Sequence, residues 1–225
     1  MCLMVFLYAF SSARNNSRKI TQLDIKFKSE NNLFITRNNV SKLLIQNEEP
    51  VTNLRKEVLA LNRLESALNL NPMIKKAQVY VDIEGTLIAE IEQKKPIARV
   101  YTNASYYIDD EGSYMPLSSN YSARVPLVTG FVEKNKLDNI FKIAKKITED
   151  EFLKKHIVEI RQNEDQTIEL KLRNREFKVQ LGSLTKLDKK ISNLKAFYKK
   201  ALKDKIVDTY TIVNLKFDNQ VVCTK

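Results

Sequence analysis

Apolar and polar residues alternate along three segments in the first half of the chain, as expected of strands with one buried face. The segments are residues 23–27, 77–83 and 86–92. The predicted buried positions are Leu23, Ile25, Phe27, Ala77, Val79, Val81, Ile83, Leu87, Ala89 and Ile91. Glu84-Gly85 favours a tight turn between the last two segments, because glycine tolerates positive φ. Residues 77–92 are therefore predicted to form a β-hairpin.

Helical spacing separates the first predicted strand from the hairpin. The apolar residues of this stretch are Val40, Leu43 and Leu44, followed by Leu61, Leu64, Leu68 and Leu70. Asn71-Pro72 ends the second helix, because proline lacks an N–H and disfavours the helical conformation of the residue before it. The predicted order is strand, helix, helix, strand, strand, and it closes at residues 94–96.

The second half of the chain reads as strands with two helices. Residues 168–172 and 177–181 alternate as a pair of strands joined by a turn near Asn174. Residues 137–147 and 184–202 have helical periodicity. The predicted apolar stripe of the longer helix is Leu184, Leu187, Ile191, Leu194, Phe197 or Tyr198, and Leu202. Its opposite face carries Lys186, Lys189, Lys190, Lys195, Lys199, Lys200, Lys203 and Lys205. That face is either a solvated helix back or a surface for anionic headgroups or an acidic partner.

The last segment, residues 210–223, alternates as one strand that a bulge or bend interrupts at Asp218-Asn219. A strand that ends a chain often lies at a sheet edge, where its unpaired backbone groups accept another strand. The alternative is an ordinary core strand with a buried Phe217.

The first-half order, with Asn-Pro-x-Ile-x-x-Ala-x-Val at 71–79 and Lys-Pro-Ile-Ala-Arg at 95–99, resembles the POTRA domain of the bacterial cell-division family FtsQ/DivIB. Segments of the second half resemble that family's C-terminal domain in the same order. They are residues 107–112, 115–117, 126–130, 177–182 and 214–222. The resemblance covers residues 20–223.

The resemblance implies an α+β fold. A POTRA domain (β-α-α-β-β) would occupy residues 20–99, and a mostly antiparallel β domain with helices on one face would occupy residues 100–225. Residues 1–19 would be a truncated membrane anchor and linker, without the family's cytoplasmic tail.

The resemblance also implies a non-catalytic, single-pass scaffold of the division machinery. Most of it would lie outside the cytoplasm, at the inner membrane of the division septum. It would recruit FtsB and FtsL and link them to septal peptidoglycan synthesis. By position, Lys216, Phe217, Asn219 and Gln220 would bind FtsB by strand addition.

The amino end supports the anchor only in part. Residues 1–10 are apolar, but ten helical residues cover about 15 Å, whereas a bilayer core is about 30 Å thick. A buried strand is the structural alternative, and a signal peptide would need a basic region before the apolar run. The favoured hypothesis is the second half of a spanning helix, although Arg14, Arg18 and Lys19 after it oppose that orientation.

The formal net charge of +11 suggests an anionic partner or surface. A second hypothesis is therefore a nucleic-acid-binding protein that uses the lysine face. It is weakened by the lack of tryptophan and of aromatics among the basic residues, so no base-stacking platform is expected. A third hypothesis, a POTRA component of outer-membrane assembly, leaves too little chain for the attached barrel.

Residue types that support catalysis are sparse. The single histidine, His156, is expected at the surface or at a helix end. Cys2 and Cys223 lie at opposite ends and are not expected to form a bridge. Neither metal-ligand spacing nor a glycine-rich phosphate loop is present, and residues 109–112 belong to a turn, not to a calcium loop. The sequence predicts no enzyme activity, cofactor, metal or small-molecule substrate.

Overall fold

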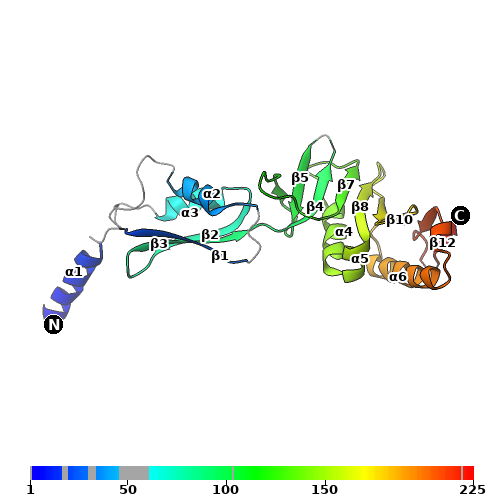
Figure 1. The fold of residues 1–225 in the computed structure, drawn as a ribbon. Helices are drawn as coiled ribbons and strands as arrows, with labels where there is room; N and C mark the ends of the chain where they lie inside the picture. Colours follow the sequence, from blue (N-terminus) through cyan, green and yellow to red (C-terminus); the bar gives the residue numbers. More distant parts are fainter. Residues whose placement is uncertain (1, 17–19, 30–33, 46–60, 103, 219) are drawn as a thin grey trace. The chain divides into compact units, whose positions relative to one another are not determined.

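The computed structural model describes residues 2–16, 20–29, 34–45, 61–102, 104–218 and 220–225, in two compact units (Figure 1). The first unit is Met1–Lys94 with Ser118–Ser122, and the second is Lys95–Leu117 with Ala123–Lys225. The chain thus leaves the first unit at Lys94, and a short later segment returns to it. The predicted domain limits, 20–99 and 100–225, stay a prediction.

The first unit is built on a three-stranded sheet in the order β1-β3-β2, with β1 parallel and β2 antiparallel to β3. Both helices lie on the same side of this sheet (Figure 1). The elements are β1 (Gln22–Phe27), α2 (Arg37–Leu44), α3 (Leu61–Asn69), β2 (Ile74–Val81) and β3 (Thr86–Gln93). Their order confirms the predicted strand, helix, helix, strand, strand arrangement.

The predicted alternation places the core of this unit correctly along β3, where Leu87, Ala89 and Ile91 are fully buried. It is wrong for Ile83, which is 83% exposed. The carboxylate of Asp82 accepts the N–H groups of Glu84 and Thr86 at 2.9 and 2.8 Å, so the turn begins before residue 83.

The prediction is also wrong for Leu70, which is 83% exposed just beyond α3. The side chain of Asn69 binds the backbone of Ala77 in β2, and this contact fixes the end of the helix. Leu70 therefore falls outside the periodic face.

Helix α1 (Cys2–Asn16) contains the amino-terminal apolar run, and its described side chains are exposed. The large apolar ones are Leu3, Met4, Val5, Phe6, Leu7, Tyr8 and Phe10. Within the described ranges, the structure contains no helix that is both long enough and apolar enough to cross a membrane.

The second unit is built on a nine-stranded sheet in the order β12-β11-β10-β9-β8-β7-β4-β5-β6. Five neighbouring pairs are antiparallel and three are parallel, which confirms the mostly antiparallel prediction. The strands are β4 (Pro96–Tyr101), β5 (Ser105–Asp109), β6 (Tyr114–Met115), β7 (Leu127–Gly130), β8 (Ile157–Gln162), β9 (Ile168–Leu172), β10 (Lys178–Gly182), β11 (Ile212–Asn214) and β12 (Val222–Thr224).

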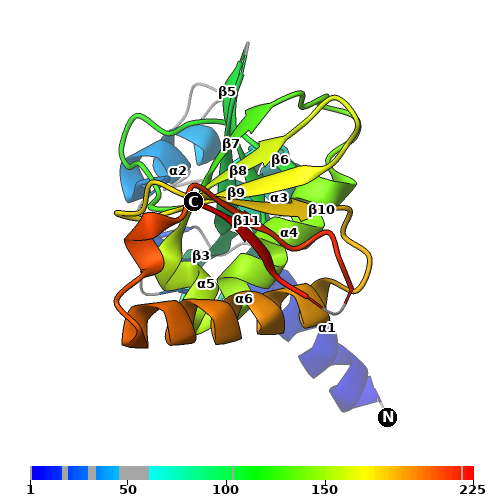
Figure 2. The ribbon, with the colours of Figure 1, turned by 90° about the vertical axis from the view of Figure 1, so that its right-hand side faces the viewer.

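The helices of this unit gather on one face of the sheet (Figure 2). They are α4 (Asp138–Glu149), α5 (Glu151–His156), α6 (Leu187–Lys203) and the short 3₁₀ helix η1 (Val207–Thr209). The predicted strand pair at 168–181 is confirmed as β9 and β10. Leu202, predicted in the apolar stripe of α6, is exposed because that buried face ends at Ala201.

The carboxy-terminal prediction of one interrupted strand is wrong. Residues 212–214 and 222–224 form two antiparallel strands, β11 and β12, so the chain reverses between them. The N–H of Leu215 still donates to the carbonyl of Gln180 in β10, and the chain leaves the sheet after that bond. Local alternation could not show this reversal, because it is equally consistent with one strand or with two.

Gly130 offers a direct test of backbone packing at the end of β7. Its φ is +88°, and a Cβ placed there would lie 2.1 Å from the carbonyl oxygen of Gln162 in β8. Gly182 has φ +71°, but its added Cβ would meet only the flexible side chain of Lys216, at 2.9 Å.

We expect Gly130→Ala to lower the free energy of unfolding by about 3 kcal/mol or more, because strain and a backbone clash add. Gly182→Ala should cost about 1–2 kcal/mol, mostly for the left-handed conformation. Urea unfolding of both variants measures the difference. Equal losses would contradict this account of β7 and β8.

Candidate partner-binding edge

The nine-stranded sheet ends in β12 on one side and in the two-residue strand β6 on the other. An edge strand presents N–H and C=O groups that an incoming strand can pair with. Among the described residues, β11 is the only strand paired with β12. The outer side of β12 is therefore a candidate for strand addition.

An edge of the first unit is closed by contrast. In the outer strand β2, the N–H of Ala77 donates to the side-chain oxygen of Asn69 at 2.8 Å. The N–H of Val79 donates to the carboxylate of Glu65 at 3.0 Å. Both acceptors come from α3, which lies along β2. Side chains that occupy edge donors in this way prevent pairing with a further strand.

The predicted partner-binding residues lie beside β12, not on an edge strand. Lys216, Phe217 and Gln220 belong to the loop between β11 and β12, and all three are exposed. Asn219 lies outside the described residues. The predicted contact of these four residues with a partner stays a prediction.

Two exposed apolar side chains lie in this loop and directly after it. Phe217 is 48% exposed, which differs from the alternative of a buried core residue, and Val222 is 39% exposed at the start of β12. Val221 and Cys223 instead pack against the core from the same end of the chain. Burial raises the pKa of the Cys223 thiol, so this cysteine acts as a packing residue. The hairpin thus combines two exposed apolar side chains with a strand edge that has no pairing strand within the described residues.

An ion pair fixes the loop to the start of α6. The Lys186 ammonium binds the carboxylate of Asp218, and this hydrogen bond lowers the pKa of Asp218, helped by the charges of Lys186, Lys189 and Lys190. Lys186 has a left-handed φ of 51° and immediately precedes the helix. The loop is therefore held where α6 begins.

Lys190 is the residue that ties α6 to the sheet. Its side chain is only 5% exposed, although the sequence pattern assigned it to the polar face of the helix. The ammonium donates to the carbonyls of Leu181 and Ser183 at 2.9 and 2.7 Å. These carbonyls lie at the end of β10, next to β11. Desolvation lowers the pKa of Lys190, and the carboxylate of Asp218 partly opposes this shift.

The aliphatic part of the Lys216 side chain also packs over Gly182. A Cβ added to Gly182 would lie 2.9 Å from Cγ of Lys216. Sequence reasoning missed the buried Lys190 and the separate strand β12. The apolar run Val221-Val222-Cys223 after Asp218-Asn219 was the available signal for a hairpin. Nothing in the sequence distinguishes the buried Lys190 from the exposed lysines near it in the helix.

His156 lies at the end of α5, as predicted, with its Nδ1 2.8 Å from the carbonyl oxygen of Phe152. In the described part of the chain, no group of three or more histidine, cysteine or acidic side chains is placed to hold a metal ion. What the arrangement at β12 offers is an edge strand with two exposed apolar side chains beside it, Phe217 and Val222.

Comparison with known proteins supports the resemblance seen in the sequence. A family model described as FtsQ/DivIB, C-terminal related matches residues 95–224, more than half of the chain. A model described as a POTRA-like domain matches residues 19–92. No curated protein matches the chain.

Lys190 generates a prediction on stability. We expect Lys190→Met to lower the free energy of unfolding by about 1 kcal/mol at neutral pH, because two buried carbonyls lose their donor. In the folded protein the amine releases its proton below its ordinary pKa of 10.5. Between that lowered pKa and 10.5 the unfolded chain holds more protons, so wild-type stability rises with pH in this window.

The stability difference between wild type and Lys190→Met should therefore grow as the pH is raised from neutral toward 10.5. Chemical unfolding at several pH values measures it. Lys199→Met, at an exposed position of the same helix, is the matched control and should show no such growth. A difference that stays constant or shrinks with pH would contradict the buried position of Lys190.

Proposed function

This chain belongs to the FtsQ/DivIB, C-terminal related family, and on that premise we propose that it is a non-catalytic scaffold of the bacterial division machinery. Its partners would be division proteins of the FtsB and FtsL type. The observation that carries this proposal is the position of β12 as the last strand of the sheet within the matched region. A partner segment would add to β12 as a further strand.

In strand addition, the backbone and the side chains make different contributions to binding. Main-chain hydrogen bonds to β12 provide affinity, and side-chain contacts provide specificity. A few apolar anchors commonly contribute most of the binding energy of an interface. Phe217 and Val222 are suited to this role because both are exposed next to the edge. Lys216 and Gln220 would contact the partner at the rim.

The proposed location is the outer side of the inner membrane at the division septum. Helix α1 supports this location, because the transfer of its exposed apolar side chains from water into lipid is favourable. The POTRA-like unit would contact other division proteins, and its β2 edge is already occupied by α3. Strand addition is therefore assigned to the second unit.

The alternative of a nucleic-acid-binding protein is disfavoured by the lysine face itself. Lys186 is paired with Asp218, Lys195 with Asp150, and Lys190 is buried. Lysines that already neutralise carboxylates or bind buried carbonyls contribute little to phosphate binding. The described part of α6 therefore offers fewer free cations than its sequence suggests.

Replacing the proposed anchor tests the scaffold function. We expect Phe217→Ser in the full chain to weaken binding of the host's FtsB-type protein at least tenfold, because the interface loses an apolar anchor. Val222→Lys should weaken binding as well, since a charge on an edge strand opposes pairing. Quantitative co-purification, with imaging of a fluorescent fusion at the septum, measures both effects.

Phe131→Ser is the matched control, because Phe131 is 56% exposed and follows β7, away from β12 in the sheet order. It should leave binding unchanged. Full binding by both Phe217→Ser and Val222→Lys would refute the assignment to this edge. A diffuse signal of the wild-type fusion, with no septal band, would refute the division role.

A further inference from the structure

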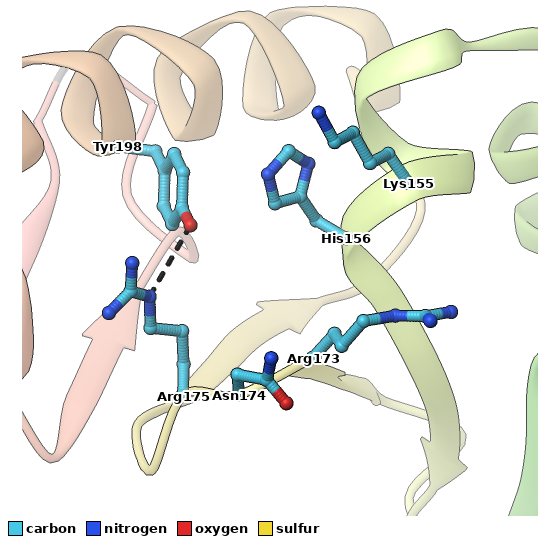
Figure 3. Close-up of a pocket in the computed structure, with 6 residues that line it drawn as sticks. All are labelled: Lys155, His156, Arg173, Asn174, Arg175 and Tyr198. Carbon is cyan, nitrogen blue, oxygen red and sulfur yellow. Dashed lines mark hydrogen bonds between the residues drawn. The ribbon is translucent and has the colours of Figure 1, made fainter.

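A pocket of about 390 Å³ lies in the second unit between the end of α5, the turn from β9 to β10, and α6 (Figure 3). Three neighbouring residues of the turn and two of α5 line it, together with one tyrosine of α6. The lining residues are Lys155, His156, Arg173, Asn174, Arg175 and Tyr198. This volume is near the lower limit of small-molecule sites, which suits a compact polar ligand.

The charge of the pocket is positive and locally unbalanced. Lys155, Arg173 and Arg175 line it, and no acidic residue does. Arg175 is paired with Asp208, through two hydrogen bonds of 2.7 and 2.9 Å. Among the described residues, the side chains of Lys155 and Arg173 have no hydrogen-bond or ion-pair partner. The pocket therefore has an excess of cations that an anionic ligand would neutralise.

The backbone of the turn that carries the two arginines is held in place by the fold. The N–H of Arg173 donates to the carbonyl of His156 at 2.7 Å, which fixes the turn against the end of α5. Asn174 at the tip has a φ of 55°, the left-handed conformation that reverses the chain and places an arginine on each side of it. Figure 3 shows Arg175 reaching toward Tyr198 and Arg173 extending the other way.

Tyr198 orients one of these groups. Its hydroxyl accepts a hydrogen bond from Nε of Arg175 at 3.3 Å, and its ring packs edge-on against His156 at a centroid distance of 5.1 Å. A guanidinium whose Nε and one terminal nitrogen are already bound loses little conformational freedom when it meets a ligand. Arg175 is therefore held at the wall of the pocket with its charge balanced by Asp208, and only its remaining N–H groups can donate to a ligand.

A cation at a helix end has a simpler explanation, because the carbonyls there attract positive charge. This attraction by helix-end carbonyls explains Lys155, in the last turn of α5. It does not explain Arg173 and Arg175, which lie in a turn between strands. Within the described residues, two unpaired cations in the lining of one pocket, Lys155 and Arg173, match a ligand that carries more than one negative oxygen group.

We propose that this pocket binds a phosphate-bearing anion, with Lys155 and Arg173 as its cationic contacts and Arg175 as a further hydrogen-bond donor. The amide of Asn174 can donate a further hydrogen bond. The phosphate can belong to a soluble diphosphate or to the headgroup of an anionic lipid. The pocket uses none of the residues assigned to partner binding at β12, so the two proposals stand or fall separately.

Calorimetric titration of the full chain with pyrophosphate tests the pocket, at about 0.15 M salt, where charges beyond about 8 Å are screened. We expect saturable binding with one site. Lys155→Gln with Arg173→Gln should weaken it at least tenfold, and Tyr198→Phe should weaken it to a smaller extent. The exposed positions of Lys155 and Arg173 predict unchanged thermal unfolding of the double variant.

Lys199→Gln with Lys200→Gln is the matched control, because it removes the same charge from exposed positions of α6 that do not line the pocket. It should change pyrophosphate affinity less than twofold. Equal losses in the two double variants would show attraction by net charge alone and would overturn the site. Absence of saturable binding to the wild type would overturn it as well.

Co-sedimentation with phosphatidylcholine vesicles, with and without phosphatidylglycerol, then distinguishes the two sources of phosphate. A loss of phosphatidylglycerol binding in the Lys155, Arg173 double variant alone would identify a lipid headgroup. Pyrophosphate binding without that loss would identify a soluble ligand. The same double variant should keep full binding of the FtsB-type partner, which separates this site from β12.

Discussion

The hydrogen-bonding demand of backbone groups at sheet edges decides which strands of this protein can accept a further strand. A strand at an edge must find partners for its N–H and C=O groups in the protein, in water or in another chain. In the first unit α3 provides them, through Asn69 and Glu65, to the outer strand β2. In the second unit the sheet ends in β12, where the described structure shows pairing only on the inner side. The same constraint thus closes the edge at β2 and, within the described residues, leaves the outer side of β12 without a pairing strand.

The position of β12 depends on contacts with α6, because the β11–β12 hairpin is too short to be stable alone. β12 pairs with β11 over three residues, too few to be stable alone. The hairpin is held because β11 pairs with β10, because Lys190 binds the carbonyls at the end of β10, and because Asp218 is paired with Lys186. The buried ammonium of Lys190 is therefore a structural link between α6 and the end of the sheet that carries β12. Its desolvation is offset by hydrogen bonds and a nearby carboxylate.

The apolar–polar periodicity of the sequence predicted correctly the strands that pack one face against a core. It failed where a single hydrogen bond or buried contact determines the position of a residue. Strands β3, β9 and β10 have one face against a core, so alternation placed them correctly. Ile83 left its predicted face because one carboxylate begins the turn at Asp82. Lys190 was assigned to solvent because a row of lysines on a helix has no local feature that marks a buried member. The pocket beside His156 could not be predicted from the sequence either, because α5, the β9–β10 turn and α6 are separated along the chain and come together only in the fold.

The edge and the pocket share α6 without sharing residues. Lys190 acts near the start of the helix and Tyr198 eight positions later, about 12 Å along the axis at 1.5 Å per residue. Both side chains are buried on the face that packs against the sheet, so the helix is fixed at both points. The lysines between and beyond them cover the outer face, where some pair with acidic residues of neighbouring segments. A strongly basic composition therefore does not make the whole helix an anion-binding surface. Among the described residues, Arg173 in the β9–β10 turn and Lys155 at the end of α5 are unpaired cations that line one pocket.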